Sequence, residues 1–125
     1  MSFTLLQVAL GGAAGAVARY LTGAALMRAL GPGFPWGTVA VNIAGSFAMG
    51  VLVVALAHLG ANRVAPLLMT GLLGGFTTFS AFSLDVVTLW ERGAAGTAVL
   101  YAAASVALSI GALVAGLALA RSVTA

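Results

Sequence analysis

The sequence predicts an all-α integral membrane protein with four transmembrane helices. Hydrophobic residues make up 62% of the 125 residues and charged residues only 6%. Soluble domains carry about 25% charged residues, so this chain has too few charges to cover a surface that faces water. The composition excludes a soluble enzyme, a disordered protein and a nucleic-acid-binding protein. The apolar runs and the turn sequences between them set the number of helices.

Each apolar run is long enough to cross a bilayer as a helix, which takes about 20 residues. Short stretches rich in Gly, Pro, Asn and charged residues separate the runs, as expected for loops. The loops cover residues 31–35, 60–63 and 91–93. We therefore expect a single transmembrane domain over 1–125, with helices at about 5–30, 38–58, 65–90 and 97–119.

Apart from Arg19, the arginines are divided equally between the two sides of the membrane. Arg28 and Arg92 fall on one side, and Arg63 and Arg121 fall on the other. The Lys/Arg bias of the loops normally sets orientation, and here it vanishes. The balance predicts insertion in both orientations, which permits an antiparallel homodimer with inverted symmetry. An accidental balance with a single orientation is the alternative.

The middle of the third span is poor helix-forming sequence. Gly74 and Gly75 are followed closely by Thr77 and Thr78. Irregular backbone at this depth is tolerated only where it is buried in protein or lines a cavity. A break in the helix would expose carbonyl oxygens suited to a small cation such as Na⁺. The alternative is an unbroken helix that packs closely through Gly71 and Gly75.

Phenylalanines recur every three residues beside this stretch, at Phe76, Phe79 and Phe82. They therefore lie near one face of a helix. The edge of a phenyl ring is electropositive, so such rings can solvate an anion without binding it tightly. Rings that only pack or face lipid are the alternative.

Polar side chains form one line on the second span and one on the fourth, each with a spacing of four residues. The two lines are Thr38, Asn42 and Ser46, and Tyr101, Ser105 and Ser109. Hydroxyls and an amide without a carboxylate suit the passage of a small ion. Hydrogen bonds between helices, worth about 1 kcal/mol each, are the alternative.

Arg19 lies inside the first span. A charged residue at this depth is expensive and indicates function by default. We expect it to draw anions into a vestibule. It could instead extend toward the membrane surface or pair with Asp85. The chain has no Cys and shows no nucleophile–base pair, metal-ligand cluster or phosphate loop, so we expect no enzymatic activity.

Residues 37–47 and 74–83 resemble the signature sequences of the Fluc/CrcB fluoride channels, and residues 11–20 resemble the first span of that family. The resemblance covers all four spans. It implies a passive fluoride-selective channel that exports cytoplasmic fluoride across the bacterial plasma membrane. It also implies a dual-topology homodimer in lipid with two fluoride pathways, each built from both subunits, and no nucleic-acid partner.

The resemblance also implies roles for individual residues. A structural Na⁺ at the dimer axis would be held by the backbone carbonyls of Gly74 and Thr77. The ring edges of Phe79 and Phe82 would face fluoride, and Arg19 would lie at the entrance vestibule. The polar groups along the pathway would be Asn42, Thr78, Ser80, Tyr101, Ser105 and Ser109. Phe76 falls outside the paired rings and is expected only to pack.

Two other classes of membrane protein also have to be considered. A small multidrug-type exporter with four helices would need a membrane-embedded carboxylate, whereas the first span has Arg19 and no acid. An accessory membrane subunit would have no transport of its own. The weak stretch in the third span and the arginine in the first argue against that class.

Overall fold

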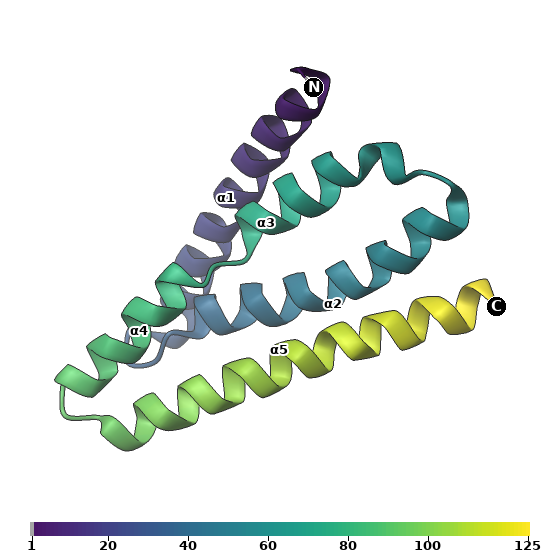
Figure 1. The fold of residues 1–125 in the computed structure, drawn as a ribbon. Helices are drawn as coiled ribbons and strands as arrows, with labels where there is room; N and C mark the ends of the chain where they lie inside the picture. Colours follow the sequence, from purple (N-terminus) through teal and green to yellow (C-terminus); the bar gives the residue numbers. More distant parts are fainter. Residues whose placement is uncertain (1) are drawn as a thin grey trace.

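The computed structural model describes residues 2–125, which are helical with short connections and contain no strand. Three long helices dominate, α1 (Ser2–Leu30), α2 (Trp36–Leu59) and α5 (Ala95–Thr124) (Figure 1). Shorter elements link α2 to α5. They are η1 (Asn62–Val64), the π-helix η2 (Pro66–Leu73), α3 (Gly74–Phe76) and α4 (Ser80–Glu91).

The helices pack in pairs, and glycines lie at several of the contacts between them. α2 lies along α5, while α1 packs against η2 and α3, and α4 packs against the first part of α5 (Figure 1). Gly50 and Gly116 allow α2 and α5 to approach closely, because a Cβ at either position would collide with backbone of the other helix. Small residues at helix contacts are typical of membrane proteins.

Three segments are long and apolar enough to cross a membrane, Trp36–Leu59, Asn62–Glu91 and Ala95–Thr124. The second of them comprises η1, η2, α3 and α4. α1 has 29 residues but is not among the three, and it carries Arg19 within its length. The chain is thus a multi-pass helical membrane protein, in which α1 corresponds to the first predicted span.

The segment Asn62–Glu91, which contains the third predicted span and is called the third segment from here on, is interrupted where the sequence predicts a break. α3 ends at Phe76, Thr77 is extended with φ −87° and ψ 159°, and α4 begins at Ser80. The prediction of a break is therefore confirmed, and an unbroken helix is excluded. The close packing offered as the alternative is present too, because a Cβ at Gly71 or Gly75 would lie 3.0 Å or less from backbone of α1.

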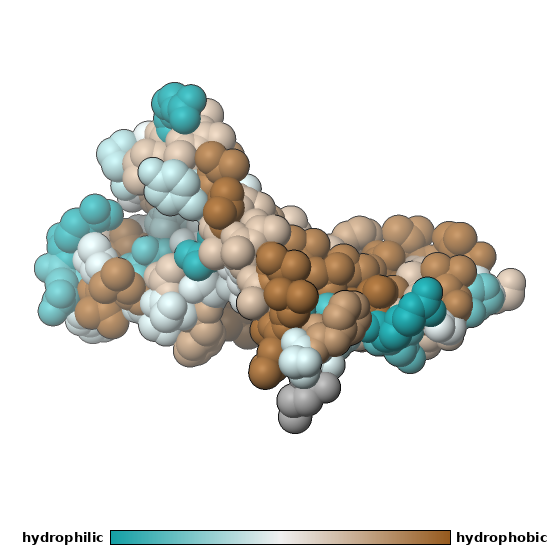
Figure 2. Space-filling view, turned by 90° about the horizontal axis from the view of Figure 1, so that it is seen from above, coloured by the Kyte–Doolittle hydropathy of each residue, from teal (hydrophilic) through white to brown (hydrophobic). Residues whose placement is uncertain are grey.

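Most large apolar side chains lie on the surface of the single chain. The core cluster contains only Phe82, Leu89, Ala98 and Tyr101. Apolar side chains occupy the middle of the face in Figure 2, and hydrophilic groups gather toward its ends. Soluble monomers rarely expose apolar surface on this scale. The surface therefore fits contact with lipid or with another apolar surface.

Candidate ion pathway

The break in the third segment is fixed by side chains from other helices and from its own ends. Asn42 of α2 makes two hydrogen bonds to one residue of the break: its Nδ2 donates to the Thr78 carbonyl (3.0 Å), and its Oδ1 accepts from the Thr78 N–H (2.8 Å). The Thr78 hydroxyl accepts from the Ala81 N–H at 3.1 Å, which caps the start of α4. The Ser80 hydroxyl lies within hydrogen-bond distance of the Thr78 hydroxyl, at 3.3 Å.

Arg19 of α1 reaches the same region. Its Nε donates to the Gly75 carbonyl at 3.1 Å. The Asp85 carboxylate, one of the alternatives for pairing with Arg19, accepts instead from the Tyr101 hydroxyl at 3.0 Å. Arg19 thus ties α1 to the break, and its half-buried guanidinium borders a cavity described below.

The carbonyls of Gly74 and Thr77 lose their usual helical partners at the break. The amides four residues further on belong to Thr78 and Ala81, and both of these N–H groups bond to side-chain oxygens. Within residues 2–125, no hydrogen bond reaches either carbonyl. Two carbonyl oxygens close together in the sequence are therefore free to act as ligands.

One cavity, the polar cavity, has a volume of about 410 Å³ and lies between α2, the break and α5. It brings together six of the residues predicted for a fluoride pathway: Asn42, Thr78, Phe79, Phe82, Ser105 and Ser109. No charged side chain lines it. Ser105 is only 5% exposed, and its hydroxyl has no hydrogen-bond partner in the part of the chain that the structure describes.

The two predicted pathway rings differ in environment. Their centroids are 5.5 Å apart with planes inclined at 44°. Phe82 is buried against Tyr101, at a centroid distance of 5.3 Å, whereas Phe79 is 77% exposed. Tyr101 is fully buried and is not among the residues that line the polar cavity. Its ring packs against the ring of Phe82.

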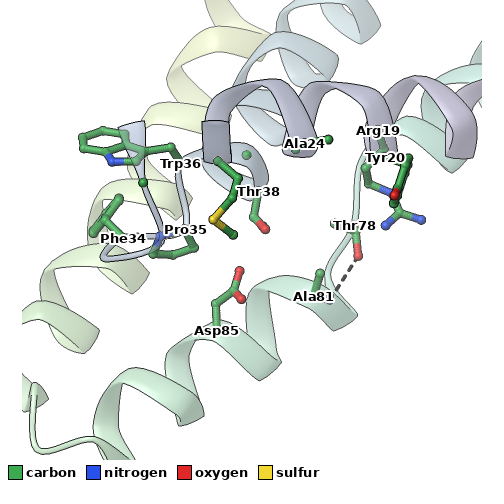
Figure 3. Close-up of a pocket in the computed structure, with 14 residues that line it drawn as sticks. Arg19, Tyr20, Ala24, Phe34, Pro35, Trp36, Thr38, Thr78, Ala81 and Asp85 are labelled. Atoms are coloured by element: carbon green, nitrogen blue, oxygen red, sulfur yellow. Dashed lines mark hydrogen bonds between the residues drawn. The ribbon is translucent and has the colours of Figure 1, made fainter. Parts of the chain in front are cut away.

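A second cavity, the Arg19 cavity, has a volume of about 470 Å³. Figure 3 shows Asp85 of α4 and Thr38 of α2 bordering it, with Arg19 and Tyr20 of α1 at its other end. Thr78 lines both cavities, so the break lies between them. Arg19 thus lines a cavity that is separate from the polar cavity.

Two residues predicted for the pathway, Ser80 and Tyr101, line neither cavity. The Ser80 hydroxyl lies within hydrogen-bond distance of the Thr78 hydroxyl instead. Asp85, considered only as a partner for Arg19, is the acceptor for Tyr101. Its position three residues after Phe82 places it on the same face of α4, and that spacing could have indicated a place near the pathway.

No group of three or more His, Asp or Glu side chains that could hold a metal ion occurs among residues 2–125. The backbone carbonyls of Gly74 and Thr77, which the sequence analysis named as ligands for a cation, accept no hydrogen bond among these residues. Neutral carbonyl oxygens suit an alkali ion better than a transition metal, which prefers imidazole or thiolate.

Comparison with known proteins gives one consistent result. The family described as CrcB-like protein, Camphor Resistance (CrcB), matches residues 6–117. Proteins named Fluoride-specific ion channel FluC are similar over almost the whole chain. The protein from Cereibacter sphaeroides is 66% identical over 121 residues, 97% of each chain. The protein from Chelativorans sp. is 62% identical over 123 residues, 97% of this chain and 98% of the relative. The protein from Paracoccus denitrificans is 57% identical over 125 residues, all of both chains. The chain therefore belongs to the CrcB family.

Proposed function

We propose that this chain forms a passive, fluoride-selective channel that exports fluoride from the bacterial cytoplasm across the inner membrane. The observation that carries the proposal is the uncharged polar cavity, which is lined by hydroxyls, an amide and two phenyl rings. The relatives named as fluoride-specific ion channels support the same function. Transport rather than catalysis is accordingly the activity of this protein.

The lining of the polar cavity suits a small anion that has to give up water. Ser105 and Ser109 offer O–H donors, and the buried Ser105 hydroxyl has no partner within the described chain. The edges of Phe79 and Phe82 offer weak positive charge. Because no cationic side chain lines this cavity, an anion is solvated without being trapped, as conduction requires.

Arg19 acts before this point, at the entrance. A cationic side chain beside a water-accessible cavity raises the local concentration of anions. Thr78 lines both the Arg19 cavity and the polar cavity. An anion drawn in beside Arg19 would pass Thr78 and Asn42 before it reaches the rings.

The working channel is an antiparallel homodimer in lipid, with α1 as the fourth transmembrane helix of each subunit. The equal division of arginines between the two ends of the helices supports dual topology. The exposure of Phe79 supports a second subunit that covers it and completes each of two pathways. Lipid and the partner subunit would cover the apolar side chains that are exposed on the single chain.

A structural Na⁺ at the dimer axis is part of the same proposal. The carbonyls of Gly74 and Thr77 would hold it, two from each subunit. Both carbonyls lack hydrogen bonds within the described chain, and Gly74 is exposed on the single chain. The bound ion would supply a fixed positive charge that holds the two broken helices together.

Efflux from liposomes that contain only the purified protein tests the channel directly. We expect fast fluoride efflux and little chloride efflux once valinomycin and K⁺ cancel the voltage. A passive channel needs no gradient of H⁺ or Na⁺, so collapsing those gradients should leave the initial rate unchanged. A folded, dimeric sample that releases no fluoride would contradict the proposal and favour an accessory subunit. Efflux that requires a proton gradient would favour an exporter.

A further inference from the structure

Two amides at the break, those of Thr78 and of Ala81 in the first turn of α4, donate to side-chain oxygens instead of to backbone carbonyls. The Thr78 N–H donates to the Asn42 side chain at 2.8 Å instead of to the Gly74 carbonyl. The Ala81 N–H donates to the Thr78 hydroxyl at 3.1 Å instead of to the Thr77 carbonyl. In each case the carbonyl that loses its partner is one of the two candidate cation ligands.

We propose that Asn42 and Thr78 are positioning residues for the cation site, because each keeps one ligand carbonyl free by binding the amide that would otherwise occupy it. This inference rests on the proposed cation site at the carbonyls of Gly74 and Thr77. It assigns Asn42 a task beyond lining the anion pathway. The side chain keeps the helix open at the point where the cation binds.

The chemistry of asparagine suits this task. Its amide offers an acceptor and a donor at once, so it matches both the N–H and the carbonyl of Thr78. Few other side chains can satisfy both groups of one residue. Without that pair, the Thr78 N–H would lack a partner at a depth where an unsatisfied amide costs several kcal/mol. In a regular helix its acceptor would be the Gly74 carbonyl, four residues back.

The threonine hydroxyl acts on the second carbonyl in the same way. Its oxygen takes the place of the Thr77 carbonyl as acceptor for the Ala81 N–H. Valine has the same shape as threonine but no acceptor. A valine at position 78 therefore returns the Ala81 N–H to the Thr77 carbonyl, whereas serine keeps the cap.

The arrangement couples the two ions. Asn42 and Thr78 both line the polar cavity, and the same two side chains hold the ligand carbonyls free. A cation on those carbonyls disfavours return of the amides to the helix, and so holds both side chains in the wall of the anion path. Any change that closes the break would release the cation and reshape that wall together.

Sodium retained by the purified dimer tests this inference without any transport measurement. Bound sodium would be measured by atomic emission after exchange into N-methyl-D-glucamine buffer, and the unfolding temperature would be compared with and without Na⁺. The variants are Asn42→Ala and Thr78→Val, with Thr78→Ser and Ser46→Ala as matched controls. Ser46 lines the same cavity one turn from Asn42 and makes no hydrogen bond to the break.

We expect wild type and both controls to retain a single sodium ion per dimer and to unfold at a higher temperature in Na⁺. Asn42→Ala and Thr78→Val should bind sodium about tenfold more weakly or not at all, the scale of one lost hydrogen bond of about 1.4 kcal/mol. Sodium retained by both variants as in wild type would overturn the inference while leaving the cation site in place. No sodium and no Na⁺ effect in wild type would overturn the cation site and the inference with it. If Asn42→Ala does not fold, the comparison of Thr78→Val with Thr78→Ser decides.

Discussion

The two halves of the interrupted third segment are held in place by different means. The first half, η2 and α3, lies against α1 with backbone close to backbone. The second half, α4, lies against α5 with ring against ring. The break at residues 77–79 joins them.

Glycines make the first contact possible. A Cβ at Gly15 would collide with the Leu72 carbonyl, and a Cβ at Gly75 would lie 2.6 Å from the Gly12 carbonyl. Backbone atoms cannot move aside as the end of a flexible side chain can. This half of the segment is therefore located by a fit that tolerates almost no added volume.

Aromatic side chains make the second contact. Phe82 is 9% exposed and packs against Tyr101, which is fully buried and bonded to Asp85. Leu89 continues this core toward the end of α4. Side chains of this kind can be exchanged for others at moderate cost.

The glycine half of the third segment therefore has a structural role, and the aromatic half has both a structural role and a role in conduction. The glycine half holds the break at a fixed depth and carries no side chain into the polar cavity before Thr77. The aromatic half both packs and lines that cavity. Substitutions in the first half should therefore act on folding, and substitutions in the second should act on ion flow.

The largest effect is expected at Gly15. Gly15→Ala should destabilise the protein by about 3 kcal/mol, the upper range for overpacking, because the new methyl group meets backbone. Gly12→Ala is the matched control, since a Cβ there has no neighbour within 4 Å. Unfolding in detergent by a chemical denaturant measures both. Equal losses at the two positions would contradict a backbone fit along this contact.

The next effect concerns the rings. Phe79→Ile and Phe82→Ile should each lower fluoride flux from liposomes at least about tenfold, equivalent to about 1.4 kcal/mol, because aliphatic carbons lack the positive ring edge. Only Phe82→Ile should also lower stability measurably in the single chain, because Phe79 is 77% exposed. Dimers are checked by size-exclusion chromatography. Unchanged flux in both variants would rule out the ring-edge mechanism.

Local sequence was sufficient to predict the helices and to locate the point of the break, with an unbroken helix left open as the alternative. Gly74, Gly75 and the two threonines after them form a weak helix in any setting, so their effect does not depend on the fold. Spacing also placed Asn42, Ser105 and Ser109 on faces that meet in one cavity, because the helical period is a local property. Features that depend on one helix alone were therefore within reach.

Contacts between helices were not within reach. Asn42 bonds to Thr78, 36 residues away, and Arg19 bonds to Gly75, 56 residues away. Spacing gives the face on which a residue lies but not the rotation or depth of the helix opposite. For the same reason spacing did not predict the hydrogen bond between Asp85 and Tyr101, because the two residues lie on different helices. Which carbonyls lose their amides could be seen only once those partners were known.

A smaller effect is expected at Tyr101. Tyr101→Phe keeps the ring against Phe82 but removes the donor to Asp85, and should cost about 1 kcal/mol, the typical net value of a hydrogen bond. Asp85→Asn keeps an acceptor oxygen and should preserve most of that interaction. A double-variant cycle in detergent measures the coupling. Coupling near zero would mean that ring packing alone holds α4 against α5.

The smallest effect is expected at Gln7, whose side chain bonds from α1 to the backbone just before the glycine half. Gln7 of α1 is buried, and its Nε2 donates to the Arg63 carbonyl at 3.2 Å, just before η2. Gln7→Met keeps the volume and removes the donor, so we expect a loss of only about 0.6 kcal/mol, the average for hydrogen bonds between membrane helices. Gly15→Ala should exceed this loss severalfold under the same denaturant. If Gln7→Met lowered stability more than Gly15→Ala, hydrogen bonding rather than close backbone packing would position η2 on α1. The glycine half would then not be located by backbone packing.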